Sequence, residues 1–464
     1  MTLKSVNPAT GETIAEYEEH SDTEIDAALA RAEAAFAAVS IRDFAGRAEK
    51  MRAAADILDA EADSFAALMT SEMGKTIASA RAEAKKCATA CRYYADNAEA
   101  FLADEAMTSD HARAFVRNLP MGPVLAVMPW NFPFWQVVRF AAPALMAGNV
   151  GLLKHASNVT GSALALEDLF RRAGFEDGFQ TLKIGSKRVE GVIRDSRVKA
   201  VTITGSEGAG SKVAEAAGSS IKKTVLELGG SDAFVVMPSA DLDKAVETGV
   251  TARMINNGQS CIAAKRFIIH DDIYDEYRDR YVERLKALKV GDPMAEDTDI
   301  GPLVSARARE DLHAQVWDSV EDGAVRSFGA EPIEGPGAYY QPGILENIPV
   351  SAPAYKDELF GPVAIFFRAA TFRRAIEIAN DHRYGLGSAI WTNDAAEIEA
   401  AADGLEAGCT FVNAMVASDP RLPFGGVKKS GYGRELARDG ILEFVNRKTV
   451  AVAGDNSAPH DGTE

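Results

Sequence analysis

Hydrophobic residues in the first hundred positions recur at helical spacing. The segment at 21–24, Ser-Asp-Thr-Glu, has the form of a capping box, which predicts the start of a helix. The residues that then share one helical face are Ile25, Leu29, Ala32, Phe36 and Val39. Two further alanine-rich amphipathic segments, about 47–70 and 76–103, predict two more helices. In the second of these, Cys87 and Cys91 are four residues apart on one side, where packing is the favoured role.

Beyond Leu119 the pattern changes to short apolar runs that alternate with helical segments. Such runs are typical of a parallel sheet covered by helices on both faces. The first set of predicted strands is 124–128, 150–154, 179–184, 198–204 and 222–228. The second set is 233–237, 266–270, 364–369, 388–392 and 410–413, with helices from Asp241 and near 272–288, 305–321, 372–380 and 394–405. Two successive sets predict two α/β domains, with a boundary near residue 230.

Two segments fit neither sheet, one at 111–120 and one late in the chain. Each is expected to be a strand that projects from the body, and a projecting edge needs a partner, which another subunit could supply. The division predicted is 1–110 with 121–229 as the first domain, 230–439 as the second, 111–120 with 440–455 as a projecting β arm, and 456–464 as a flexible tail.

Composition narrows the class of protein. The 464 residues are 47% hydrophobic and 25% charged, as in ordinary globular proteins, and the net charge of −18 disfavours nucleic acid as a partner. The N-terminus has no pattern of a secretory signal, and the longest apolar stretch is broken by Pro143, so neither export nor membrane association is expected. Four cysteines suggest a reducing compartment, so we expect a cytoplasmic protein. No cysteine or histidine cluster has metal-binding spacing, so no metal site is predicted.

Cys261 lies in the segment "NNGQSCIAAKR" between a predicted helix and a predicted strand. Gly258 allows close approach of the backbone, and backbone N–H groups there could stabilise an anion beside the sulfur. A buried, inert cysteine is about as consistent with the spacing as a nucleophile is. The segment alone therefore leaves both roles open.

Three other segments carry candidate chemistry, each with an ordinary structural alternative. Glu227 in "LELGG" ends a strand, where desolvation would raise its pKa toward that of a general base. Taken alone, the segment favours an ordinary ion pair of Glu227 with Lys222 or Lys223. Asn131 lies between two prolines, in a turn rigid enough for an oxyanion donor or for a structural Asx turn. The glycine-rich turn at 202–210 leads from a strand into a helix, a context that suits a phosphate but is common.

Six motifs together resemble the aldehyde dehydrogenase family over almost the whole chain. They are "PWNFP", "TGS", "LELGG", "GQSC", "ELFGPV" and "PFGGVKKSGYGRE", in the order and at the separations usual in the family. Within it, the chain looks most like bacterial succinate semialdehyde dehydrogenases of the shorter type. The resemblance implies two doubly wound domains, one for the cofactor and one for catalysis, and a β arm that forms a homodimer or homotetramer.

The resemblance also implies the roles of the catalytic residues. Cys261 would be the nucleophile and Glu227 the general base, while Asn131 and the Cys261 N–H would form the oxyanion hole. The aldehyde would be oxidised through a thiohemiacetal and a thioester. The expected reaction is NAD(P)-dependent oxidation of succinate semialdehyde to succinate.

For the cofactor, the resemblance implies a row of contacts. The residues are Trp130, Lys154, Ser157, Gly205, Ser206, Leu228, Glu358 and Phe360. Many NAD-using relatives carry a glutamate at the position of Ser157, where a carboxylate would repel a 2′-phosphate. Serine leaves room for that phosphate, so NADP is the expected preference, with NAD as the alternative.

For the substrate, Arg139 is the expected clamp for a carboxylate, with Ser418 and Arg421 completing the pocket. Ile255 stands where some relatives have a second arginine. One alternative is a broad aliphatic or aromatic aldehyde dehydrogenase in which Phe134 and Trp135 line an apolar tunnel. The other is a protein that keeps the fold for a structural purpose without catalysis.

Overall fold

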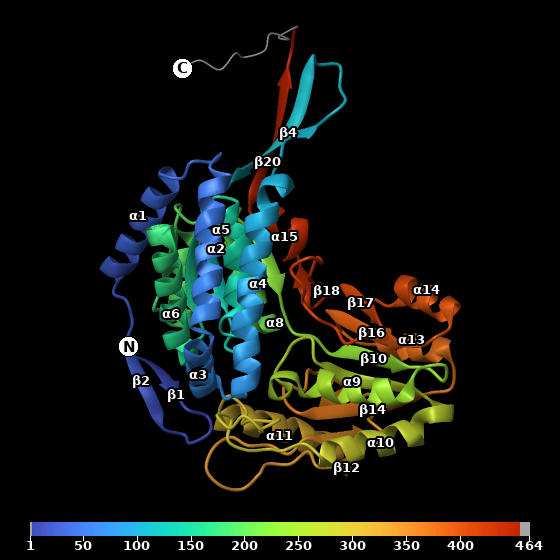
Figure 1. The fold of residues 1–464 in the computed structure, drawn as a ribbon. Helices are drawn as coiled ribbons and strands as arrows, with labels where there is room; N and C mark the ends of the chain where they lie inside the picture. The colour runs from blue at the N-terminus through green and yellow to red at the C-terminus, as the bar shows by residue number, and fades with distance from the viewer. Residues whose placement is uncertain (1, 455–464) are drawn as a thin grey trace.

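The computed structural model describes residues 2–454, so the tail predicted at 456–464 and the last residue of the predicted arm lie outside the described residues. Two large parallel sheets, each covered by helices, confirm the predicted α/β class (Figure 1). The chain begins with an antiparallel hairpin, which the sequence did not predict, made of β1 (Thr2–Val6) and β2 (Thr13–Glu18). Among the described helices, none is long and apolar enough to cross a membrane.

The first large sheet has six strands in the order β19-β9-β8-β5-β6-β7, and only β19 runs antiparallel to its neighbour. The strands are β5 (Pro123–Met128), β6 (Val150–His155), β7 (Phe179–Thr181), β8 (Ala200–Thr204), β9 (Lys223–Glu227) and β19 (Gly431–Tyr432). Alternate side chains of β5 enter different cores. Val124 packs with helices α2 (Phe44–Ala60), α4 (Ile77–Phe101) and α5 (Trp135–Met146), whereas Leu125 packs with α1 (Asp22–Ala37), α7 (Val189–Arg194) and α8 (Glu207–Gly218). Both faces of the sheet are therefore buried, which explains the continuous apolar strands.

The helices around this sheet match the sequence pattern with one exception. Ser21 and Glu24 form the predicted capping box at the start of α1. The single helix expected at 47–70 is wrong, because the chain breaks at Glu61, where φ is −108° and ψ is 17°. The helices are α1 (Asp22–Ala37), α2 (Phe44–Ala60), α3 (Ala62–Met73), α4 (Ile77–Phe101), α5 (Trp135–Met146), α6 (Thr160–Phe170), α7 (Val189–Arg194) and α8 (Glu207–Gly218).

The second large sheet has seven strands in the order β12-β13-β14-β11-β10-β16-β17. Its strands are β10 (Asp232–Val236), β11 (Ala264–His270), β12 (Val325–Phe328), β13 (Gly343–Glu346), β14 (Val363–Ala369), β16 (Gly387–Trp391) and β17 (Cys409–Val412). Its helices are α9 (Leu242–Met254), α10 (Tyr274–Lys286), α11 (Ala306–Glu321), α12 (Pro353–Lys356), α13 (Phe372–Asn380) and α14 (Ala395–Gly404). Short strands β15 (Tyr384–Gly385) and β18 (Val427–Lys428) pair with each other beside it.

A three-stranded sheet projects from the body (Figure 1). Its long strands, β4 (Arg113–Pro120) and β20 (Val445–Val452), pair antiparallel along their whole length, and β3 (Glu105–Ala106) pairs with β4. Each predicted projecting strand thus finds its partner within the chain. Helix α15 (Ala437–Leu442) leads from the first sheet into this arm. The exact domain limits predicted from the sequence stay predictions.

Candidate active site

A left-handed turn positions Cys261 between α9 and β11. Asn256, Asn257 and Gly258 have φ of 56°, 59° and 77°, a conformation that is costly for residues other than glycine. Hydrogen bonds hold the two asparagines: Asn256 donates to the Asn131 carbonyl at 2.7 Å, and Asn257 to the Pro302 carbonyl at 3.0 Å. A Cβ on Gly258 would lie 2.3 Å from a backbone carbon of Gly361, so this position requires glycine. The turn is therefore rigid, as a nucleophile's support must be.

The Cys261 side chain is partly exposed and reaches a pocket. Among residues 2–454, no group accepts a hydrogen bond from the Cys261 backbone N–H, which leaves that donor available to a ligand. Burial raises the pKa of the Cys261 thiol to about 12, while the nearby cations Arg139 and Lys265 lower it. Burial therefore favours the thiol, whereas the two cations favour the thiolate, which is the nucleophilic form.

Asn131 lies in the turn after β5 and is 4% exposed. Its Nδ2 donates to the Gln259 carbonyl at 3.2 Å, two residues before Cys261. An amide nitrogen carries two hydrogens, so the second has no acceptor among the described residues. Behind the turn, Glu83 accepts hydrogen bonds from the backbone N–H groups of Phe134 and Trp135, each at 2.8 Å. This buried carboxylate holds the start of α5 and the turn in place.

Glu227 ends β9 and is 2% exposed, and neither of its carboxylate oxygens has a hydrogen-bond partner of ordinary geometry among the described residues. Burial raises the pKa of Glu227 well above its usual value, the Glu435 carboxylate raises it further, and Arg139 opposes both. The backbone just after Glu227 touches the nucleophile segment, because a Cβ on Gly230 would lie 2.6 Å from the Cys261 carbonyl oxygen. The raised pKa suits a group that takes up a proton.

Arg139, the expected clamp, points into the pocket but is already committed to the protein. It forms an ion pair with Glu435, both side chains being buried, and its guanidinium stacks 4.8 Å from the centre of the Phe424 ring. Its Nη2 also lies 3.4 Å from the Thr204 hydroxyl. The partner glutamate lies far away in the sequence, so no local pattern could have revealed it.

The pocket at Cys261 has a volume of about 180 Å³. Its lining is mostly apolar and includes Phe132, Trp135, Ile255, Ile262, Met415, Val416 and Phe424. Pockets for drug-sized ligands hold about 300–1,000 Å³, so this one suits a short substrate. Trp135 lines it as expected, but Phe134 does not: its ring is fully buried and packs 5.0 Å from that of Phe65.

Of the other expected substrate residues, Ser418 lines the pocket, whereas Arg421 does not. Arg421 is exposed and forms an ion pair with Asp419. Lys86, on α4, was not among the sequence candidates, although it lines the pocket and donates to the Ser418 hydroxyl at 2.8 Å. The sequence gives no signal of this position, because Lys86 follows Lys85 in a charged stretch of the predicted helix.

The residues expected along the cofactor gather at the carboxyl ends of the first sheet's strands. Trp130, Lys154, Gly205 and Leu228 follow or end β5, β6, β8 and β9, where ligands of parallel sheets collect. Ser206 caps α8, and Ser157 opens a short 3₁₀ turn after β6. From the second domain, Phe360 meets Trp130 edge to face, with ring centres 5.7 Å apart.

Lys154 is a buried cation at this edge of the sheet. The residue is 8% exposed, burial lowers the pKa of its ammonium, and it forms no ion pair within residues 2–454. The Glu19 carboxylate opposes this shift only in part, so the buried ammonium would gain from a further acceptor, such as a cofactor phosphate or ribose. Glu358, by contrast, forms a 2.9 Å ion pair with Lys265.

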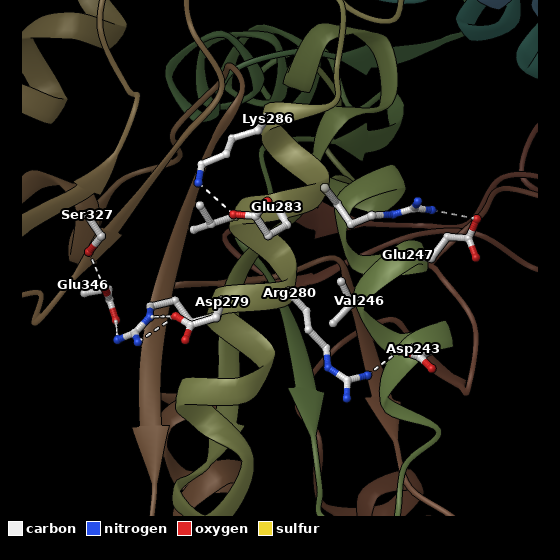
Figure 2. Close-up of a pocket in the computed structure, with 12 residues that line it drawn as sticks. Asp243, Val246, Glu247, Asp279, Arg280, Glu283, Lys286, Ser327 and Glu346 are labelled. Atoms are coloured by element: carbon white, nitrogen blue, oxygen red, sulfur yellow. Dashed lines mark hydrogen bonds and ion pairs between the residues drawn. The ribbon is translucent and has the colours of Figure 1, made fainter.

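A wider groove lies elsewhere, beside α9, α10 and β12, with a volume of about 1010 Å³ (Figure 2). Its charged side chains are paired with one another, including Lys286 with Glu283 at 2.7 Å and Arg284 with Glu247 at 3.1 Å. The charges of this groove are therefore largely neutralised by one another, and none of the candidate catalytic residues lines it.

The chain belongs to the aldehyde dehydrogenase family, whose sequence profile matches residues 1–450. It is 56% identical over 469 residues to a succinate-semialdehyde dehydrogenase [NADP(+)] of Mycobacterium avium (strain 104), covering 100% of this chain and 99% of that protein. It is also 56% identical to succinate-semialdehyde dehydrogenase [NADP(+)] 1 of Mycobacterium tuberculosis (strain H37Rv), covering 98% and 100%. A crystal structure of succinic semialdehyde dehydrogenase from Streptococcus pyogenes in complex with NADP+ superposes with a TM-score of 0.95, at 37% identity, covering 97% of this chain and 100% of that one.

Proposed function

We propose that this enzyme oxidises succinate semialdehyde to succinate and uses NADP as the preferred hydride acceptor. The observation that carries the proposal is the 56% identity, over both full lengths, to a relative with that name. The small pocket that ends at Cys261 supports a short aldehyde as the substrate. Four free cysteines agree with work in the cytoplasm, and the β arm offers the edge of β20 for a homodimer or homotetramer.

In the proposed mechanism, the Cys261 thiolate attacks the aldehyde carbon, and a C–S bond forms as the carbonyl oxygen becomes an oxyanion. Asn131 Nδ2 and the free Cys261 N–H donate hydrogen bonds to that oxygen. NADP, when bound, supplies the acceptor for the hydride that leaves the same carbon. Glu227 then takes a proton from water as the water attacks the thioester, which releases the acid and restores the thiolate.

On the cofactor side, Lys154 offers an unpaired ammonium, and Ser157 a hydroxyl where a glutamate would repel a phosphate. Trp130, Phe360 and Leu228 would enclose the rings, while Gly205 and Ser206 offer a helix N-terminus to the diphosphate. Glu358 would contact a ribose from its ion pair with Lys265. These contacts form the proposed NADP site.

Steady-state kinetics test the proposal. With NADP as the cofactor, we expect kcat/KM to be higher for succinate semialdehyde than for glutarate semialdehyde or butanal. With succinate semialdehyde as the substrate, we expect kcat/KM to be higher with NADP than with NAD. The variant Cys261→Ala should lose NADPH production, whereas Cys409→Ser, on β17 outside the pocket lining, should keep it. Equal efficiency with butanal would instead favour a broad aldehyde dehydrogenase, and full activity of Cys261→Ala would favour a protein that keeps the fold without this chemistry.

A further inference from the structure

Lys86 places an ammonium without an anionic partner in the substrate pocket. The Lys86 ammonium nitrogen lies over the Trp135 ring, 4.1 Å from the ring centre. Lys86 forms no ion pair within residues 2–454. Burial, reinforced by the nearby Arg139 charge, lowers the pKa of Lys86 to about 8. Burying a cation costs free energy unless an anion pairs with it, so the pocket favours the binding of a negatively charged group.

The acidic side chains around Lys86 are all engaged elsewhere. Glu83, one turn earlier on α4, pairs with Lys75 and accepts the backbone hydrogen bonds at the start of α5. Asp419, next to Ser418, pairs with Arg421. The remaining titratable neighbour, Cys87, carries a thiol whose pKa burial raises well above its usual value, so it stays neutral. Among residues 2–454, these contacts therefore leave none of the neighbouring carboxylates free to neutralise the ammonium.

The Ser418 hydroxyl completes a site for a carboxylate. Its oxygen accepts one hydrogen bond from Lys86 at 2.8 Å and another from the Trp135 indole N–H at 3.0 Å. A hydroxyl has two lone pairs and one hydrogen, so both lone pairs are occupied and the hydrogen remains to be donated. Within the described residues no acceptor for that hydrogen is present. The ammonium and the hydroxyl thus offer a carboxylate an ionic partner and a donor.

We propose that Lys86, assisted by Ser418, binds the distal carboxylate of the substrate while Cys261 holds the aldehyde. This inference deepens the proposed oxidation of a short ω-carboxylated aldehyde and rests on it. Lys86 adds a cation to the pocket beside Arg139, whose Nε is paired with Glu435, while Ile255 supplies no charge there.

The test compares succinate semialdehyde with butanal, which has four carbons but no charge. Lys86→Met should lower kcat/KM for succinate semialdehyde about 100-fold, chiefly through KM, because the charged partner is lost. Its efficiency with butanal should change less than about 3-fold, a selectivity that a merely structural defect would not produce. Lys86→Arg should recover part of the loss, and Lys85→Met, at the exposed neighbouring position, should behave like the parent.

Two results would overturn the inference, and they distinguish failure of the Lys86 role from failure of the proposed function. If the parent enzyme prefers succinate semialdehyde and Lys86→Met keeps that preference, the role of Lys86 is wrong while the proposed function stands. If the parent shows no preference over butanal, the proposed function fails, and this inference with it. Thermal unfolding and NADP titration of Lys86→Met show whether the variant is folded, and a selective loss for Arg139→Met alone would assign the carboxylate to Arg139 instead.

Discussion

Lys265 lies between the nucleophile and the proposed cofactor contact, because its Nζ pairs with Glu358 at 2.9 Å and donates to the Cys261 carbonyl at 2.7 Å. It also donates to the Ser260 carbonyl at 2.8 Å. This 1% exposed ammonium therefore connects Glu358, the carboxylate proposed to contact the ribose, to the backbone that carries the sulfur. Lys265 is a positioning residue that no sequence pattern singled out.

We expect Lys265→Met to lower kcat about 10- to 100-fold, because a hydrogen bond to a charged group contributes about 1.5–3 kcal/mol. Beyond burial, the pKa of Cys261 is lowered by Lys265 and raised by Glu358. Alkylation of Cys261 by iodoacetamide should therefore need a higher pH in Lys265→Met and a lower pH in Glu358→Gln. Profiles that move in the same direction in both variants would contradict this arrangement.

Arg139→Met should impair charged and uncharged aldehydes alike. The guanidinium is paired with Glu435 and lowers the pKa of Glu227 against the larger effect of burial, so its loss raises the pKa of the proposed base. We expect kcat to fall about 10-fold or more for both succinate semialdehyde and butanal, with the optimum of the kcat profile moved to higher pH. A fall confined to succinate semialdehyde would show that Arg139 binds the carboxylate.

The sequence predicted the strands that are buried on both faces. It did not predict features that depend on contacts between segments far apart in the chain. The strands from β5 to β9 were recognisable because their apolar runs are continuous, and α13 begins and ends where the pattern placed it. The break at Glu61 has no proline or glycine to signal it, and strands β12 and β13 lie in a stretch without a clear alternation. Such features depend on packing that a local pattern does not contain.

In the candidate site too, the residues in local motifs could be predicted, whereas the contacts between distant segments could not. Cys261, Glu227 and Asn131 stand in motifs, so sequence reasoning could select them before their geometry was known. The commitment of Arg139 to Glu435, and the proximity of Lys86 to Ser418, depend on long-range contacts between different elements. The sequence shows which side chains are charged, but it does not show which of these charges are already paired within the protein.

Glu227→Gln should make stability less dependent on pH. Burial and Glu435 raise the pKa of Glu227 in the folded state, so between the ordinary glutamate pKa and the raised one the folded protein binds more protons than the unfolded chain. The free energy of unfolding must then fall as the pH rises through that window. Glutamine does not titrate, so the Tm of the variant relative to the parent should increase from pH 4 to pH 8. Glu399→Gln, exposed on α14, should show a constant difference, and a falling difference for Glu227→Gln would contradict the burial effect.

Ser157→Glu should reverse the proposed cofactor preference. Ser157 opens the turn that follows Lys154 and β6, so a carboxylate there would lie beside the 2′-phosphate that Lys154 is proposed to bind. We expect kcat/KM with NADP to fall about 100-fold or more, because opposed like charges cost several kcal/mol, and the efficiency with NAD to be kept or improved. The matched variant Ser157→Ala removes the hydroxyl without adding charge and should cost NADP only about 10-fold. Initial rates with both cofactors at saturating aldehyde measure the two effects, and an equal loss for NAD and NADP in Ser157→Glu would show that the side chain does not face the 2′ position.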